Sequence, residues 1–143
     1  MIKYYEFKQR QRNEFDALPM KAAFGDKQFE EMMAGWGLTT SDEDLKKVAS
    51  LGGGGFCLKK DLRLFEEFGE KVAKENEEYF KNDEQLKDAF LYEFGNHECG
   101  YAGDPWQALY ALGYTKKDAS KDSRLYRIFK EAWDWYVDNM KDC

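Results

Sequence analysis

The feature that most constrains the fold is a long amphipathic stripe between residues 61 and 79. Apolar side chains recur there at spacings of three and four, and charged residues fill most of the other positions. This period is that of one face of an α-helix, not of a strand. The stripe consists of Leu64, Phe65, Phe68, Val72, Asn76 and Tyr79. We therefore expect a helix here, capped by Asp61.

The same periodicity predicts helices along most of the chain. The predicted helices cover residues 4–17, 26–37, 82–97, 106–112, a turn from 115, and 122 or 123 onward. Asp26 is expected to cap the second of them. Asp104-Pro105 is typical of a helix start, because the N–H that proline lacks is unpaired there anyway. Residues 115–118 have the form of a capping box, and a loop is expected over 100–103.

A run of glycines marks the most probable β element. Gly52, Gly53, Gly54 and Gly55 stand between two short apolar runs at 47–51 and 56–59. Such a pattern predicts an antiparallel hairpin, and residues 20–24 predict another short strand. A chain of 143 residues has the length of one domain, and it contains no repeat or linker. We expect an α+β fold, a mostly helical single globular domain over residues 1–143 with one short glycine-rich β-hairpin.

Charge is unevenly distributed along the chain. The net charge is −6, and residues 61–98 carry 12 acidic side chains against 5 basic ones. Binding to nucleic-acid phosphates needs a basic face, so no direct nucleic-acid binding is expected. An acidic segment instead suits a basic surface on a partner, because complementary charge orients encounter. The alternative is an ordinary solvated helix face.

The cysteines and the N-terminus bear on the compartment. Cys57, Cys99 and Cys143 are odd in number and widely separated, which favours a reducing cytosol. The first residues are charged from Lys3 and lack the apolar core of a secretory signal. No apolar run approaches the length of a membrane span. We expect a cytoplasmic protein.

The densest polar cluster lies around the single histidine. Glu93 and His97 are four residues apart on a predicted helix and share one face, with Asp104 beyond a glycine loop. The three are ligand or metal candidates, yet zinc and iron sites usually contain several His or Cys ligands. No metal or other cofactor is therefore expected. His97 as a base for Cys57 or Cys99 is an alternative, and a capped, structural cluster is another.

The glycine run resembles a phosphate loop only in composition. The P-loop pattern needs a Gly-Lys-Ser/Thr ending, whereas Phe56 to Lys59 follows here and is expected to be extended. Four glycines imply positive φ or a close approach of other atoms. That approach comes either from internal packing or from a ligand, such as a nucleotide held near Lys59 and Lys60.

Several segments together resemble a known family. They are the opening Met1 to Tyr5, Pro19-Met20, Ala23-Phe24, Leu51 to Phe56, Asn96 to Asp104, and Ala108 to Thr115. The chain resembles a family of small uncharacterised proteins carried by phages and mobile elements of Gram-positive bacteria. The resemblance brings no assigned activity. Genes of this size in such elements often encode inhibitors of host defence, including anti-CRISPR proteins, which is an argument by association.

The leading hypothesis is a non-enzymatic phage protein in the cytoplasm of a host bacterium. It would inhibit a host defence protein, an RNA-guided nuclease, by direct protein binding through an acidic and aromatic-rich surface. The residues assigned to partner binding are Glu66, Glu67, Glu70, Glu77, Glu78, Trp106 and Trp135. The alternatives are a small metal-dependent or cysteine hydrolase centred on His97, and a nucleotide-binding sponge at the glycine run.

Overall fold

The computed structural model describes residues 2–140, and its contacts divide the chain into two compact units. Unit 1 combines the N-terminal residues up to Arg10 with the chain from Lys74 onward, and unit 2 comprises Gln11 to Ala73. Two helices, α1 (Tyr4–Asp16) and α4 (Leu62–Phe80), begin in one unit and end in the other. Among the helices of the described residues, none has both the length and the apolar character that a membrane crossing requires.

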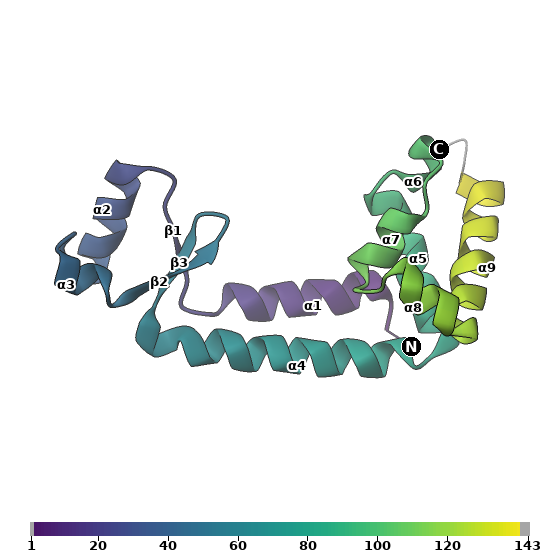
Figure 1. Cartoon of the computed structure of the whole chain (residues 1–143), viewed down its shortest axis with the longest axis horizontal. Coiled ribbons are helices and arrows are strands. Elements are labelled where there is room, and N and C mark those ends of the chain that lie inside the picture. The colour runs from purple at the N-terminus through teal and green to yellow at the C-terminus, as the bar shows by residue number, and fades with distance from the viewer. Residues whose placement is uncertain (1, 141–143) are drawn as a thin grey trace. The chain divides into compact units, whose positions relative to one another are not determined.

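Unit 1 is helical. It contains α5 (Asp83–Asn96), α6 (Cys99–Ala102), α7 (Trp106–Ala111), α8 (Lys116–Lys121) and α9 (Ser123–Met140), together with the first turns of α1 and the last turns of α4. Helix α5 packs against both α7 and α9, as Figure 1 shows. Its side chains Leu86, Phe90 and Phe94 are fully buried and contact an aromatic-rich core that includes Phe129 and Trp133. Aromatic pairs of this kind stabilise a core beyond the area that they bury.

Unit 2 combines a small sheet with short helices. It contains β1 (Lys21–Ala22), α2 (Asp26–Gly35), α3 (Asp42–Leu45), β2 (Val48–Gly52), β3 (Gly55–Leu58) and a 3-10 turn at Lys59–Asp61. The sheet is antiparallel, with β3 between β1 and β2. Met32 and Met33 of α2 are buried beneath it, and Phe29 packs edge-on against Phe56.

The structure confirms the fold class predicted from the sequence. The chain is mostly helical, and the glycine-rich hairpin is present as β2 and β3, to which β1 adds a third strand. The predicted capping box at residues 115–118 is formed by Thr115 and Asp118. The sequence leaves the cap of the predicted helix over 82–97 open between Asn82 and Asp83, and the structure places it at Asn82, whose Oδ1 accepts from the Gln85 N–H. These signals are local, so the sequence alone specifies them.

The cap at Asp61 stays a prediction: α4 begins at the next residue, Leu62, after a 3-10 turn. Two other local expectations were wrong. Gly25, with φ of 130°, occupies the cap of α2, and Asp26 is already helical. Residues 99–102 are the short helix α6 and not a loop, since Gly103 N–H donates to the Cys99 carbonyl at 2.8 Å and closes the turn in a left-handed conformation.

Candidate functional site

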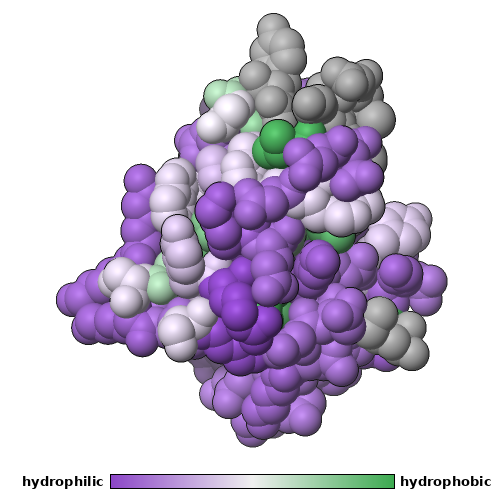
Figure 2. Space-filling view, turned by 90° about the vertical axis from the view of Figure 1, so that its right-hand side faces the viewer, coloured by the Kyte–Doolittle hydropathy of each residue, from purple (hydrophilic) through white to green (hydrophobic). Residues whose placement is uncertain are grey.

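The five acidic residues predicted to bind a partner all lie on α4 and are exposed. Glu66, Glu67 and Glu70 belong to unit 2, while Glu77 and Glu78 belong to unit 1. At 100° per residue, Arg63 and Lys74 fall on the same exposed arc of the helix. Helix α4 therefore offers an acidic but not uniform surface, and it needs an apolar contact to define a binding position. The side of the molecule on which α9 lies is also mostly hydrophilic, with small pale and apolar areas between polar side chains (Figure 2).

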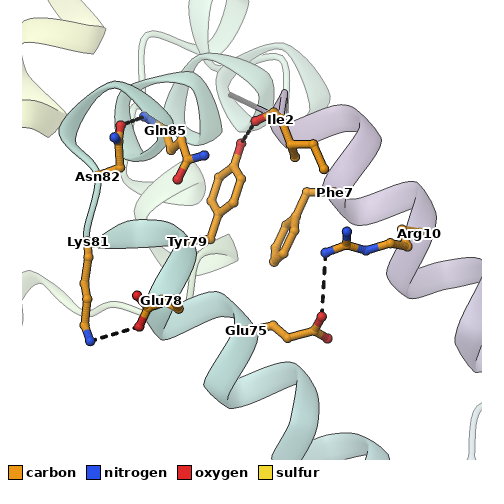
Figure 3. Close-up of a pocket in the computed structure, with 9 residues that line it drawn as sticks. All are labelled: Ile2, Phe7, Arg10, Glu75, Glu78, Tyr79, Lys81, Asn82 and Gln85. Atoms are coloured by element: carbon orange, nitrogen blue, oxygen red, sulfur yellow. Dashed lines mark hydrogen bonds and ion pairs between the residues drawn. The ribbon is translucent and has the colours of Figure 1, made fainter.

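A pocket of about 670 Å³ lies beside the last turns of α4 in unit 1 (Figure 3). Its wall is the stacked pair Phe7 and Tyr79, whose ring centroids are 4.3 Å apart. The Tyr79 hydroxyl donates to the Ile2 carbonyl at 2.7 Å. Two ion pairs border the pocket, Arg10 with Glu75 at 3.6 Å and Lys81 with Glu78 at 3.0 Å. Its charges are thus already compensated, which does not favour a strongly charged ligand.

Glu75 is the exception in this pocket. Its Oε2 faces Arg10, but its Oε1 is buried and has no hydrogen-bond partner. A buried carboxylate oxygen without a donor is costly unless water or a ligand supplies one. The oxygen is accordingly a position at which a donor from outside the chain would be stabilised.

A second groove of unit 1, of about 620 Å³, is lined by four aromatic side chains among other residues. It is bordered by residues of α1, α5 and α9, and we call it the Trp135 groove. It is lined by Lys3, Tyr5, Glu6, Asp88, Leu91, Tyr92, Trp135 and Tyr136. Tyr5 is 61% exposed and Trp135 is 45% exposed, although both are large and partly apolar. Side chains of this type are the usual anchors of protein interfaces.

Charged groups border the aromatic rings of the Trp135 groove. Asp88 Oδ2 accepts from the Tyr4 backbone N–H at 2.7 Å, which fixes that carboxylate at the edge. Glu6 is exposed and forms no ion pair within the described residues. Lys3 approaches Asp88 only to 3.9 Å and is well exposed. Aromatic faces next to carboxylates are suited to a cationic side chain, which gains both a cation–π and an ionic contact.

The two tryptophans predicted as anchors differ in their environments. Trp106 is half-buried and packs on the core, with its ring 5.2 Å from Phe129 and Lys116 Nζ 4.8 Å above it. Trp135 instead projects into its groove. The groove residues Tyr5, Tyr92 and Glu6 were not identified from the sequence. The adjacent Tyr4 and Tyr5 did indicate an exposed aromatic side chain, because only one of two neighbouring residues on a helix can face the core.

Among the described residues of unit 1, the buried charged side chain is Glu93, which is 1% exposed. Lys8 Nζ donates to its Oε1 at 3.1 Å, and His97 Nε2 lies 3.1 Å from its Oε2. Asn96 Nδ2 donates more weakly to Oε2 at 3.4 Å. Burial, assisted by the Glu93 carboxylate, raises the pKa of Tyr4. The sequence predicted the Glu93 and His97 contact but missed Lys8, which lies 85 positions away in the chain.

The other members of the predicted polar cluster are engaged elsewhere. Asp104 Oδ1 accepts from the Trp106 N–H at 3.0 Å just before α7, although the cap position is occupied by Pro105 and not by Asp104 as predicted. No group of three or more His, Cys, Asp or Glu in residues 2–140 is placed to hold a metal ion. Burial raises the pKa of both Cys57 and Cys99, which lowers the thiolate fraction that a nucleophile needs. Cys143 lies outside the described residues.

The glycine run forms the turn of the β2–β3 hairpin. Gly52, Gly53 and Gly54 have φ of 86°, 59° and 83°, a region that other residues rarely adopt. The Phe24 ring occupies the space where a Cβ on Gly54 would lie, and the Gly54 carbonyl accepts from Ala23 N–H at 2.9 Å. Turn geometry and internal packing thus account for three of the four glycines, and Gly55 pairs with Ala22 within the sheet.

Comparison with protein families finds a match over most of the chain. The matching family is described as a family of unknown function (DUF7659), and its model covers residues 3–135. No curated protein and no solved structure matches. The family description names no activity, partner or source, so function has to be argued from the residues.

Proposed function

Because the chain belongs to the DUF7659 family, which brings no activity with it, we propose a function from the surface of the molecule: a non-catalytic protein that binds and inhibits a partner with a basic surface. The observation that carries the proposal is the Trp135 groove. Its two most exposed rings, Tyr5 and Trp135, lie next to carboxylates, and large exposed aromatic side chains are a cost to a free protein unless they serve a contact.

The composition of the groove favours a cationic side chain of the partner, a lysine or an arginine. A guanidinium placed over Trp135 or Tyr5 would gain a cation–π contact of about 0.5–2 kcal/mol, depending on how far water is excluded. Glu6 would add a charge-assisted hydrogen bond. A neutral apolar side chain would use the rings but leave the Glu6 carboxylate, which forms no ion pair with any described residue, without a cation.

The exposed acids of α4 and the net charge of −6 support the same class of partner. Long-range attraction between this protein and a basic surface would speed encounter, and salt would weaken it. RNA-guided nucleases hold their guide and target in a positively charged channel. We therefore propose an RNA-guided nuclease as the partner, and hence an anti-CRISPR role, and the support for it is charge complementarity.

The proposal is tested with a purified guide-loaded nuclease of the Cas9 type. Binding is measured by biolayer interferometry at several salt concentrations, and inhibition is measured as loss of target cleavage. We expect binding that weakens steeply between about 0.05 and 0.5 M salt. Trp135→Ala and Tyr5→Ala should each weaken binding about 30-fold, the size of an interface hot spot. Tyr126→Ala is the matched control, because Tyr126 is 47% exposed on the same helix, α9, but does not line the groove.

The contribution of the acids is measured separately at each end of α4. One variant carries Glu66, Glu67 and Glu70 changed to Gln, and another carries Glu77→Gln with Glu78→Gln. Glu30→Gln with Asp138→Asn changes the net charge as much as the second variant does, at exposed positions off the helix. Binding that is insensitive to salt and to both α4 variants would remove the acids from the interface. Absence of any binding by the wild-type chain would refute the nuclease as partner.

A further inference from the structure

Unit 2 brings four lysines together at the open end of its hairpin. Lys46 and Lys47 precede β2, and Lys59 and Lys60 follow β3. The strands pair antiparallel, with Val48 opposite Leu58, so the two lysine pairs meet at the same end. A backbone hydrogen bond of 2.8 Å from Lys59 N–H to the Lys47 carbonyl extends the pairing to this point. The glycine turn lies at the other end of the hairpin.

The positive charge at this end is mostly uncompensated. All four lysines are exposed, and Lys47 is paired with Asp44 at 3.1 Å. Lys46, Lys59 and Lys60 form no ion pair with any described residue. Unit 2 as a whole carries 12 acidic against 9 basic residues, so the cluster does not reflect a generally basic unit. Holding like charges together without partners is unfavourable, which points to an anion that is bound there in use.

The lysines border an apolar groove of about 460 Å³. Its floor consists of Trp36, Leu38 and Leu58, all half-buried. Lys21 Nζ lies 5.1 Å from the Trp36 ring centroid but does not line the groove. The volume falls in the range of small-molecule sites. The groove is thus lined by both apolar side chains and several ammonium groups.

We propose that this groove binds a nucleoside phosphate, with the base on the Trp36 floor and the phosphates on the lysines. Lysine ammonium groups bind phosphate as point charges, and a nucleobase stacks favourably on an aromatic or apolar surface. An acidic peptide would satisfy the lysines, but its carboxylates are not joined to a flat ring that fits the floor. The proposal is independent of the protein partner, because it concerns other residues and a different ligand.

The test is isothermal titration of the purified full-length chain with ATP, adenosine and inorganic pyrophosphate. We expect ATP to bind with a stoichiometry of one. Adenosine and pyrophosphate should each bind at least about tenfold more weakly, because each uses only half of the groove. In a two-dimensional NMR spectrum, ATP should shift the indole N–H of Trp36 while that of Trp133, in the core of unit 1, stays in place.

The lysines are tested with Lys59→Gln and Lys60→Gln together, which should lower the affinity for ATP at least about tenfold. The matched control is Lys116→Gln with Lys117→Gln. These two lysines are also adjacent and exposed, and Lys116 also lies over a tryptophan, Trp106. All four substitutions replace exposed side chains, and an unchanged thermal unfolding midpoint confirms that each variant is folded.

Several results would overturn the proposal. ATP that gives no heat and no Trp36 shift at millimolar concentration excludes a nucleotide site. Equal affinity for ATP and pyrophosphate excludes a role for the apolar floor. An ATP affinity unchanged in the Lys59 and Lys60 variant places the ligand elsewhere. A short oligoglutamate peptide that binds this groove more tightly than ATP would assign it to an acidic protein segment.

Discussion

The burial of the Glu93 carboxylate predicts that replacing Lys8 destabilises unit 1. Lys8→Met removes the ammonium that donates to Glu93 Oε1 at 3.1 Å, while a similar unbranched stem remains beside Tyr4 and Tyr92. The carboxylate, 1% exposed, would then retain the Tyr4 hydroxyl, His97 and the long contact with Asn96. The substitution therefore isolates the contribution of one charged donor to a buried acid.

The magnitude follows from the burial of the two partners. Removing one member of a fully buried pair costs about 3–5 kcal/mol, and a hydrogen bond to a charged group contributes about 1.5–3 kcal/mol. The Lys8 side chain is 40% exposed, so water can replace part of the lost interaction, and the lower range applies. We expect Lys8→Met to lower the free energy of unfolding of unit 1 by about 2 kcal/mol. Adding Glu93→Met should recover part of this loss, because no charge then remains buried.

The assay is urea unfolding followed by tryptophan fluorescence in a Trp36→Phe background. The remaining tryptophans, Trp106, Trp133 and Trp135, all belong to unit 1, so the signal reports that unit alone. Lys130→Met is the control. Lys130 forms a shorter pair with Asp134, at 2.8 Å, but both partners are exposed, and we expect no measurable change. The reasoning would be refuted if Lys8→Met lowered the free energy of unfolding no more than the control does. It would also be refuted if the double variant lost as much free energy of unfolding as Lys8→Met and Glu93→Met lose together.

Two further predictions concern Tyr79 and the glycine turn. Burial, and then nearby carboxylates, raises the pKa of Tyr79 to about 12. The folded state thus favours the neutral phenol of Tyr79. This stabilisation is complete below the pKa of the unfolded chain, near 10, and is lost as the pH rises through 12. The thermal unfolding midpoint should therefore fall over that pH interval, and it should fall less in Tyr79→Phe. Gly54→Ala should destabilise unit 2 by about 1–2 kcal/mol in chemical unfolding, because φ is 83° and the Phe24 ring is in the way. Gly69→Ala, in the interior of α4 with open space around it, should instead stabilise by about 0.5–1 kcal/mol, and the opposite order would contradict the argument.

Sequence reasoning succeeded where the determining interactions are local. The Asn82 cap, the Thr115 capping box and the glycine hairpin each depend on residues within a few positions of one another. The contact between Glu93 and His97 also spans a single helical turn. In each of these cases the chemistry of the motif is sufficient, because no distant segment is needed to complete it.

The rest depends on long-range packing. Lys8 contacts Glu93, which lies 85 positions later in the chain, and the Phe24 ring lies against Gly54. The spacing of these residues in the sequence does not predict either contact. The division into two units likewise passes through the interiors of α1 and α4 and not through a loop, so no proline, glycine or polar linker marks it in the sequence. The expectation of a single domain, which was based on the absence of a linker, stays a prediction.

The two proposed sites differ in chemistry and lie in different units, and thermodynamic linkage shows whether they act together. The Trp135 groove has carboxylates beside its rings, whereas the groove of unit 2 that Trp36, Leu38 and Leu58 line has lysines. If ATP changes the affinity for the nuclease by some factor, the nuclease must change the affinity for ATP by the same factor. A factor of one, measured in both directions, would mean that the protein carries two independent binding sites. A larger, reciprocal factor would make the nucleotide a regulator of inhibition. The helices α1 and α4, each of which begins in one unit and ends in the other, would then carry the coupling.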